Sequence, residues 1–344
     1  MTIDRGPEAL LALVEPLCAE AGLAAPLRLE RLAGGGNNRV YRVETATGPA
    51  LLKEYFRHPG DPRDRLAAEQ AFSRFAWDHG IRALPQPLAC DRAAGIGLYE
   101  FLAGRKLSPG AVSQSHVEGA ADFVAAVNRH RDDPAAARLP IASEACFSLA
   151  EHLACVERRI ERLSGLDPES DLHREAIAIF ASRLRPLWSR TRAGVLRAVG
   201  DAGTSLHDAL PPRQRVVSPS DFGFHNCLVT DAGLRFIDFE YAGWDDPAKM
   251  ACDFFCQPEV PVPQQFLQGF VERVEAVVGA DGGLAGRVRL LLPVYGVKWC
   301  CIMLNEFLPV GDTRRAFARA DISLESRRAD QLRKVEAALA RLEA

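Results

Sequence analysis

Three oxygen-bearing side chains lie close together between residues 218 and 240. Asp221 and Asn226 share one loop, and Asp238 ends a predicted β-hairpin over residues 227–237. Because a hairpin brings its two ends together, we expect the three side chains to converge. Carboxylate and carboxamide oxygens are ligands that Mg²⁺ takes alongside substrate phosphates, and no competing Cys/His set is present. The spacing therefore predicts metal-assisted phosphoryl transfer.

Such chemistry needs a nucleotide site, and the first third of the chain offers candidates. Gly34, Gly35 and Gly36 lie between two predicted strands, where a turn can bring backbone N–H groups over phosphate oxygens. Lys53, in the next predicted strand, can pair with phosphates, and Glu69 in the following helix can hold that lysine. Each signal alone is common in unrelated proteins. Their order along the chain, followed by the Asp-x4-Asn loop and the hairpin aspartate, matches the kinase pattern.

The elements that must position these residues divide the chain into two parts. The first third alternates between period-2 segments and two helical stretches, which predicts a small sheet with helices; the remainder is mainly helical. We expect an α+β fold with a β-rich N-lobe over residues 1–103 and a larger helical C-lobe over 104–344. A cleft between lobes is the default place for a ligand. Predicted strands cover 27–32, 40–44, 50–55, 87–90, 97–102, 216–217, 227–230 and 234–237, and predicted helices 7–22, 63–79, 110–131, 144–164, 170–199, 247–256, 262–279, 284–306 and 314–343.

Three segments carry a resemblance to a known family. Residues 34–43 (GGGNNRVYRV), the loop from Asp221 to Asn226 and residues 237–243 (IDFEYAG) resemble the aminoglycoside phosphotransferase and choline kinase-like family. Its members are small-molecule kinases with a protein-kinase-like bilobal fold. The resemblance covers nearly the whole chain in lobe order, and its motifs are dense in 32–102 and 216–256.

The resemblance implies a role for each matching residue. Asp221 is then the catalytic aspartate and ATP and Mg²⁺ are the cofactors, with transfer of the γ-phosphoryl group to a hydroxyl of a small molecule. The implied Mg²⁺ ligands are Asn226 and Asp238, and the implied ATP-binding residues are Gly34, Gly35, Gly36, Asn38, Lys53 with its partner Glu69, and the lobe connector from Glu100 to Leu102.

The chain departs from the family before the catalytic aspartate, where Pro219 and Ser220 replace the usual His-Gly pair. His225 is retained beside Asn226, and we interpret it as a loop-positioning residue. Two alternatives follow from this departure and from the fold: a nucleotide-binding pseudokinase that acts as an interaction module, and a protein kinase. The second is disfavoured because no Ala-Pro-Glu segment follows an Asp-Phe-Gly motif.

Candidate substrate residues follow the metal loop and recur in a late helix. Glu240 and Asp245 could bind an ammonium or hydroxyl group, whereas Asp246, directly before a proline, is expected to cap the next helix. Lys298 and Trp299 could form a second wall of the pocket. The sequence leaves open an amino sugar, a choline-like alcohol, a free sugar and a homoserine-like amino acid.

The composition narrows the class of protein. The 344 residues include 42 Lys+Arg and 45 Asp+Glu, a formal charge of −3, which disfavours nucleic-acid or anionic-membrane partners. The N-terminus lacks a signal-peptide pattern and no uninterrupted apolar run is long enough to span a bilayer, so we expect a cytoplasmic protein. Nine cysteines without a CxxC pair predict reduced, buried thiols. The oligomeric state is not readable from the sequence.

Overall fold

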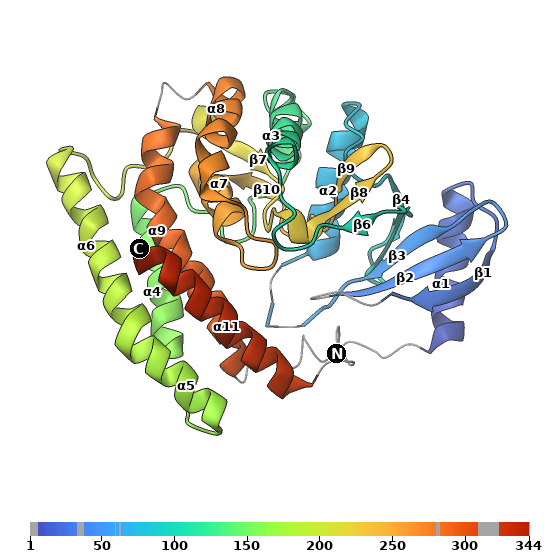
Figure 1. Cartoon of the computed structure of the whole chain (residues 1–344). Helices are drawn as coiled ribbons and strands as arrows, with labels where there is room; N and C mark the ends of the chain where they lie inside the picture. Colours follow the sequence, from blue (N-terminus) through green and yellow to red (C-terminus); the bar gives the residue numbers. More distant parts are fainter. Residues whose placement is uncertain are drawn as a thin grey trace.

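The computed structural model describes residues 6–32, 38–58, 60–61, 63–279, 283–308 and 323–343. The glycines predicted to cover the phosphates, Gly34 to Gly36, lie outside these residues, as does the start of the predicted helix 314–343. Within the described residues the α+β architecture is confirmed, with an antiparallel sheet in the N-lobe and a helical C-lobe (Figure 1). The boundary at residue 103 stays a prediction.

The N-lobe is built on one five-stranded antiparallel sheet. Its strand order is β1-β2-β3-β5-β4. Along β3, neighbouring side chains point to opposite faces of the sheet, so one face is apolar and the other carries the candidate lysine. Leu52 is fully buried in the core beneath one face, and Lys53 lies on the other face. The strands are β1 (Pro26–Arg31), β2 (Arg39–Thr45), β3 (Ala50–Glu54), β4 (Pro87–Asp91) and β5 (Ile96–Glu100).

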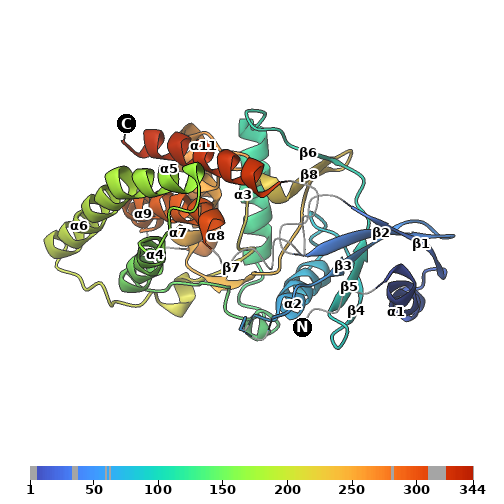
Figure 2. The same cartoon turned by 90° about the horizontal axis from the view of Figure 1, so that it is seen from below.

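Two helices cover the sheet. Helix α1 (Pro7–Glu20) packs its apolar side on β1, β4 and β5, where Leu10 and Val14 are buried. Helix α2 (Arg65–Asp78) lies on the opposite side, as Figure 2 shows. Its buried Phe72 belongs to the same apolar core as the C-lobe. Helix α2 therefore couples the sheet to the rest of the molecule.

The C-lobe packs its helices around one large apolar core (Figure 1). The predicted helix 170–199 is three successive segments, since a π-helical turn, Phe180–Leu184, separates α5 from α6. The predicted helical stretches 262–279 and 284–306 each include a 3₁₀ turn at one end. The helices are α3 (Gln114–Asn128), α4 (Leu149–Leu163), α5 (Asp171–Ile179), α6 (Arg185–Asp201), α7 (Pro247–Cys256), α8 (Leu267–Val278), α9 (Leu284–Leu304) and α11 (Leu324–Glu343).

Short strands of the C-lobe flank the loop that contains Asp221 and Asn226. The predicted hairpin is present as β8 (Cys227–Thr230) and β9 (Gly233–Phe236), and β6 (Arg105–Lys106) extends it. Strand β7 (Val216–Ser218) pairs with β10 (Gly243–Asp245). Neither β6 nor β10 was predicted, because two or three residues are too few to show an alternating pattern.

Helix α9 is the central helix of the C-lobe. By length and composition, Leu284–Phe307 could cross a membrane, but 61% of its most apolar stretch is buried inside the protein. It packs against α4, α7 and α11. The terminal helix α11 thus lies on its own lobe. The nine cysteines are free thiols and seven are buried, as predicted.

Candidate active site

A cavity of about 560 Å³, here called the interlobe cavity, lies between the sheet and the C-lobe loops. Val40 and Leu51 line it from the sheet, and Leu228 and Ile237 from the hairpin below. The interlobe cavity therefore has apolar side chains on its sheet side and on its hairpin side. The polar lining consists mainly of residues singled out in the sequence: Lys53, Glu69, Glu100, Asp221, Asn226 and Asp238.

Lys53 connects the two lobes. Its Nζ donates to Oε2 of Glu69 on α2 at 2.6 Å and also to Oδ1 of Asp238 after the hairpin. Tyr55 donates to the same Oε2 of Glu69 at 2.6 Å. The side chains of Lys53 and Glu69 are 7% and 6% exposed, so water screens their ion pair weakly. The structure thus brings the predicted lysine, its glutamate and the hairpin aspartate together.

The charges around Lys53 keep it protonated. Burial lowers the pKa of Lys53, but the carboxylates of Asp238, Glu69 and Glu240 raise it well above its ordinary value. Burial also raises the pKa of Glu69, and Lys53 opposes that shift. Lys53 is therefore a cation in the lining of the interlobe cavity.

The loop before Asp221 is held in a conformation that few residue types favour. Ser220 and Asp221 have φ angles of 48° and 39°, and Asp238 has 70°, all in the left-handed region. The hydroxyl of Ser218 accepts the N–H of Ser220 at 3.1 Å, which supports the turn. Asn128 of α3 holds the preceding strand, because its carboxamide accepts from and donates to the main chain of Val217.

Asn226 is fixed beside Asp221 and Asp238. Its Nδ2 donates to the main-chain carbonyl of Asp221 at 3.1 Å, which leaves Oδ1 available as a ligand atom. The N–H of Ile237 donates to the carbonyl of Asn226 at 3.0 Å, so the hairpin ends meet as expected. Strand β9 ends at Phe236, and Asp238 lies two residues beyond it.

His225 lies against the catalytic candidate. Its Nε2 is 3.5 Å from Oδ1 of Asp221. Burial raises the pKa of Asp221, but the interaction with His225 lowers it below its ordinary value overall. The His225 ring packs on Gly223, where an added Cβ would lie 2.7 Å from Nδ1. This geometry agrees with a loop-positioning role for His225.

A second cavity of about 430 Å³, here called the side cavity, adjoins the first. Asp221, His225 and Glu259 line both cavities. Asp221 therefore stands where a group bound in one cavity would face a group bound in the other. Helices α4, α7 and α9 form the far wall of the side cavity.

Lys298 and Trp299, predicted as a substrate wall, line the side cavity but already bind a carboxylate. Nζ of Lys298 donates to both carboxylate oxygens of Asp253 at 2.9 and 3.0 Å, and Nε1 of Trp299 donates to Oδ1 at 2.9 Å. Lys249 lies 3.4 Å from the same carboxylate. Burial raises the pKa of Asp253, but Lys298 and Lys249 lower it below its ordinary value.

Replacing Lys298 by methionine should lower the free energy of unfolding by about 2 kcal/mol at pH 7, because a buried carboxylate loses its closest cation but keeps Lys249. The lowered pKa of Asp253 means that this stabilisation exists above the unfolded pKa of about 3.9 and is lost as the pH falls through the folded value. The difference between variant and wild type should therefore shrink below about pH 4. Denaturant unfolding at several pH values measures it.

Lys334 provides a matched control, since it pairs with exposed Glu259. Lys334→Met should cost less than about 0.5 kcal/mol. An equal loss in both variants would contradict the assigned role of the buried pair.

Three predicted site residues lie outside both cavity linings. Asn38 is buried, donating Nδ2 to Glu240 at 2.5 Å and accepting the N–H of Phe56 at 3.1 Å. Glu240 is buried and lies 3.8 Å from Nε of Arg65. The Asn38–Glu240 contact thus connects the start of strand β2 to the segment that follows Asp238.

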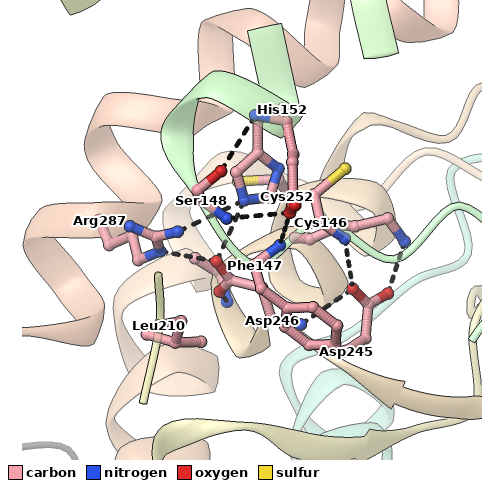
Figure 3. Close-up of polar contacts among 12 residues, drawn as sticks. Cys146, Phe147, Ser148, His152, Leu210, Asp245, Asp246, Cys252 and Arg287 are labelled. Carbon is pink, nitrogen blue, oxygen red and sulfur yellow. Dashed lines mark hydrogen bonds and ion pairs between the residues drawn. The ribbon is translucent and has the colours of Figure 1, made fainter. Parts of the chain in front are cut away.

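Asp245, the third of these residues, is fully buried at the end of β10 (Figure 3). It accepts from Nζ of Lys249 at 2.6 Å and from the N–H groups of Cys146 and Asp246. The predicted cap is confirmed, because Asp246 accepts the N–H of Ala248 at 2.7 Å at the start of α7. The other carboxylate oxygen of Asp246 binds Nε of Arg287 at 2.6 Å.

Some residues of the site were missed in the sequence. Lys249 lines the side cavity, and its four-residue spacing from Asp245, which is typical of a helical ion pair, was an available signal. Arg159 and Arg162 on α4 line the side cavity, but an arginine on an amphipathic helix has no local sequence signal that distinguishes a cavity position from a solvated one. Asn128 likewise acts through a contact 89 residues away.

The profile of the phosphotransferase enzyme family matches residues 28–270, and the chain belongs to this family. A search of curated protein sequences found no match to this chain. Among solved structures, a spectinomycin phosphotransferase in complex with ADP and spectinomycin has a TM-score of 0.61 at 12% identity, covering 99% of each chain. A putative aminoglycoside phosphotransferase from Ralstonia eutropha gives 0.59 at 13%, covering 98% of each chain.

A choline/ethanolamine kinase family protein from Mesorhizobium loti has a TM-score of 0.53 at 20% identity, covering 93% of each chain. These similarities confirm the kinase-like bilobal fold that the motifs implied.

Proposed function

We propose that the protein is a small-molecule kinase that transfers the γ-phosphoryl group of Mg-ATP to a hydroxyl group. The observation that carries the proposal is the position of Asp221 in the wall shared by the two cavities. On one side lie Lys53, Asn226 and Asp238, which suit a nucleotide and a cation. On the other side a separate cavity has room for an acceptor.

The interlobe cavity is assigned to ATP. We propose that adenine lies between the apolar side chains of the sheet and the hairpin and binds the main chain of Phe101 and Leu102, since the N–H of Glu100 already donates to Gln86. Lys53 then meets the phosphates, held by Glu69. The related spectinomycin phosphotransferase was solved with ADP, which supports a nucleotide here.

Asn226 and Asp238 are the proposed Mg²⁺ ligands. Their donors are hard oxygens, and among the described residues there is no cluster of three or more His, Cys, Asp or Glu that would hold a metal without a substrate. This donor set fits a cation that shares its coordination with phosphate oxygens. Bound Mg²⁺ would offset negative charge on the transferred group.

Asp221 is proposed to orient the acceptor hydroxyl and to take its proton. Phosphoryl transfer has a loose transition state, so positioning and charge neutralisation supply most of the rate. A carboxylate whose pKa is lowered stays ionised at neutral pH and can accept that proton late in the reaction. His225 would keep the carboxylate pointed at the junction of the cavities.

A phosphate-transfer screen tests the proposal. The protein is incubated with Mg-ATP and sugars, amino sugars, amino alcohols and hydroxy acids, and phosphorylated products are detected directly. Transfer to at least one compound, abolished by EDTA, is the expected result. Tight nucleotide binding without transfer to any compound would refute the kinase proposal and favour the pseudokinase alternative.

A further inference from the structure

The side cavity is lined by many charged residues, and most of them are already held in ion pairs. Its lining contains five Lys and Arg residues against four Asp and Glu residues, one of which is Asp221. Two of the basic residues pair with carboxylates outside the lining, Arg63 with Asp61 and Lys249 with Asp245, so Arg162 is the basic residue of the lining that has no ion-pair partner in the described part of the chain. The basic residues are Arg63, Arg159, Arg162, Lys249 and Lys298, and the other acidic residues are Glu144, Asp253 and Glu259.

Each of these other carboxylates already has a cationic partner. Glu144 accepts from Arg159 at 2.6 Å, and Asp253 accepts from Lys298. Glu259 accepts from Lys334 at 2.8 Å. An ammonium group entering the cavity would have to compete with these ion pairs, so the cavity lacks a ready site for an amine.

The aromatic side chains of the side cavity also form no complete binding site for a cation. Tyr241 lines the cavity, but the guanidinium of Arg63 already lies 5.5 Å from its ring centre. Trp299 is the other aromatic residue in the lining. A quaternary ammonium is normally held by several aromatic faces together, and a single tryptophan does not form such a cage.

Two arginines on α4 line the cavity, and one of them, Arg162, has no carboxylate partner in the described part of the chain. Arg159 lines the cavity with a side chain that is 8% exposed; its Nη2 donates to Glu144, and its Nε is buried away from the cavity without a hydrogen-bond partner among the described residues. Arg162 is exposed and has no carboxylate within ion-pair distance in the described part of the chain; its Nε donates only to the carbonyl of Arg158. Residues three apart share one helix face, so both guanidinium groups address the same cavity.

We propose that the acceptor carries, besides its hydroxyl group, an anionic group, a carboxylate or a phosphate, that binds Arg159 and Arg162. This inference rests on the proposed kinase function and specifies its substrate class. The planar guanidinium matches both anions through paired N–H donors. Asp221 and the two arginines line the same cavity, so one molecule could present its hydroxyl group to Asp221 and its anionic group to the arginines.

Binding can be measured without turnover, because Trp299 lines the cavity and reports on it by fluorescence. The probes form two matched series: glucose, glucosamine, glucuronate and glucose 6-phosphate, and glycerol, 3-amino-1,2-propanediol, glycerate and glycerol phosphate. In at least one series an acid should bind about tenfold or more tighter than the amine, within the millimolar range or better. Trp299→Phe should remove the signal.

Arg162→Ala should weaken the binding of the acid about tenfold, and Arg158→Ala is the matched control. Arg158 is an exposed arginine on the same helix that lines a different groove, between α4 and α6, so its loss should change affinity less than about twofold. Arg159→Lys, which keeps the charge beside Glu144, should weaken binding without unfolding the protein. Tighter binding of the amines, equal losses in the Arg158 and Arg162 variants, or no binding of any acid would each overturn the inference.

The two proposals fail in different ways. Phosphorylation of the amines but not the acids would retain the kinase function and refute the anionic acceptor. Arg162-dependent binding of an acid, with no phosphate transfer to any hydroxyl compound, would retain the anion site and refute the kinase function.

Discussion

Replacing Asp221 by asparagine should lower kcat by about 10³-fold while leaving the affinity for ATP within about twofold. Asparagine keeps the shape of the side chain, but it cannot accept the proton of the acceptor hydroxyl. The nucleotide contacts assigned to Lys53, Asn226 and Asp238 do not pass through the Asp221 side chain. Single-turnover transfer measures the first quantity, and fluorescent-nucleotide binding measures the second.

The pH dependence of the wild type adds an independent readout. Because His225 lowers the pKa of Asp221, its carboxylate should be ionised throughout the range from about pH 5 to 8. No acidic limb from this group should then appear in kcat over that range. Asp231→Asn, in the exposed hairpin turn, is the matched control and should keep wild-type kcat. Asp221→Asn with near-normal kcat would exclude the proton-accepting role.

The part of the site fixed by local chain geometry could be predicted from the sequence. Asn226 and Asp238 flank a tight hairpin and Asp221 shares the loop before it, so all three line one cavity, and Lys53 meets Glu69 because one strand and the next helix carry them. Long periodic helices were found for the same reason. Elements of two or three residues, such as β6 and β10, have too little pattern to be seen.

Roles set by tertiary packing were not predictable. Glu240 and Asp245 were candidates for binding a substrate, yet both are buried outside the two cavities, beside Asn38 and Lys249 respectively. For Asp245 the neighbouring sequence offers the four-residue spacing to Lys249, whereas the burial of Glu240 depends on Asn38, 202 residues earlier. The same holds for Arg159, whose partner Glu144 lies fifteen residues earlier.

The replacement of His-Gly by Pro219 and Ser220 has a structural consequence. Ser220 occupies a left-handed φ of 48°, which glycine adopts freely and serine at a cost of about 1 kcal/mol. The hydrogen bond from its N–H to Ser218 helps to hold that conformation. The loop thus retains its turn, and Asp221 still reaches the junction of the two cavities.

Replacing Asp238 by asparagine should remove most of the gain in nucleotide affinity that Mg²⁺ provides, a loss of about 10- to 100-fold. The reason is that one of only two proposed protein ligands loses its charge. Asp238 also accepts a hydrogen bond from Lys53, so a nucleotide affinity measured with metal alone would mix two effects. The informative quantity is the ratio of ADP affinities with Mg²⁺ and with EDTA, obtained by calorimetry for each variant.

Glu69→Gln separates the two effects, because Glu69 also binds Lys53 but is not a proposed metal ligand. It should weaken nucleotide binding by a similar factor with and without Mg²⁺, and so leave the ratio unchanged. If Asp238→Asn also leaves the ratio unchanged, Asp238 is not a metal ligand. If the ratio falls equally in both variants, the effect of Asp238 passes through Lys53, and the cation must be held elsewhere.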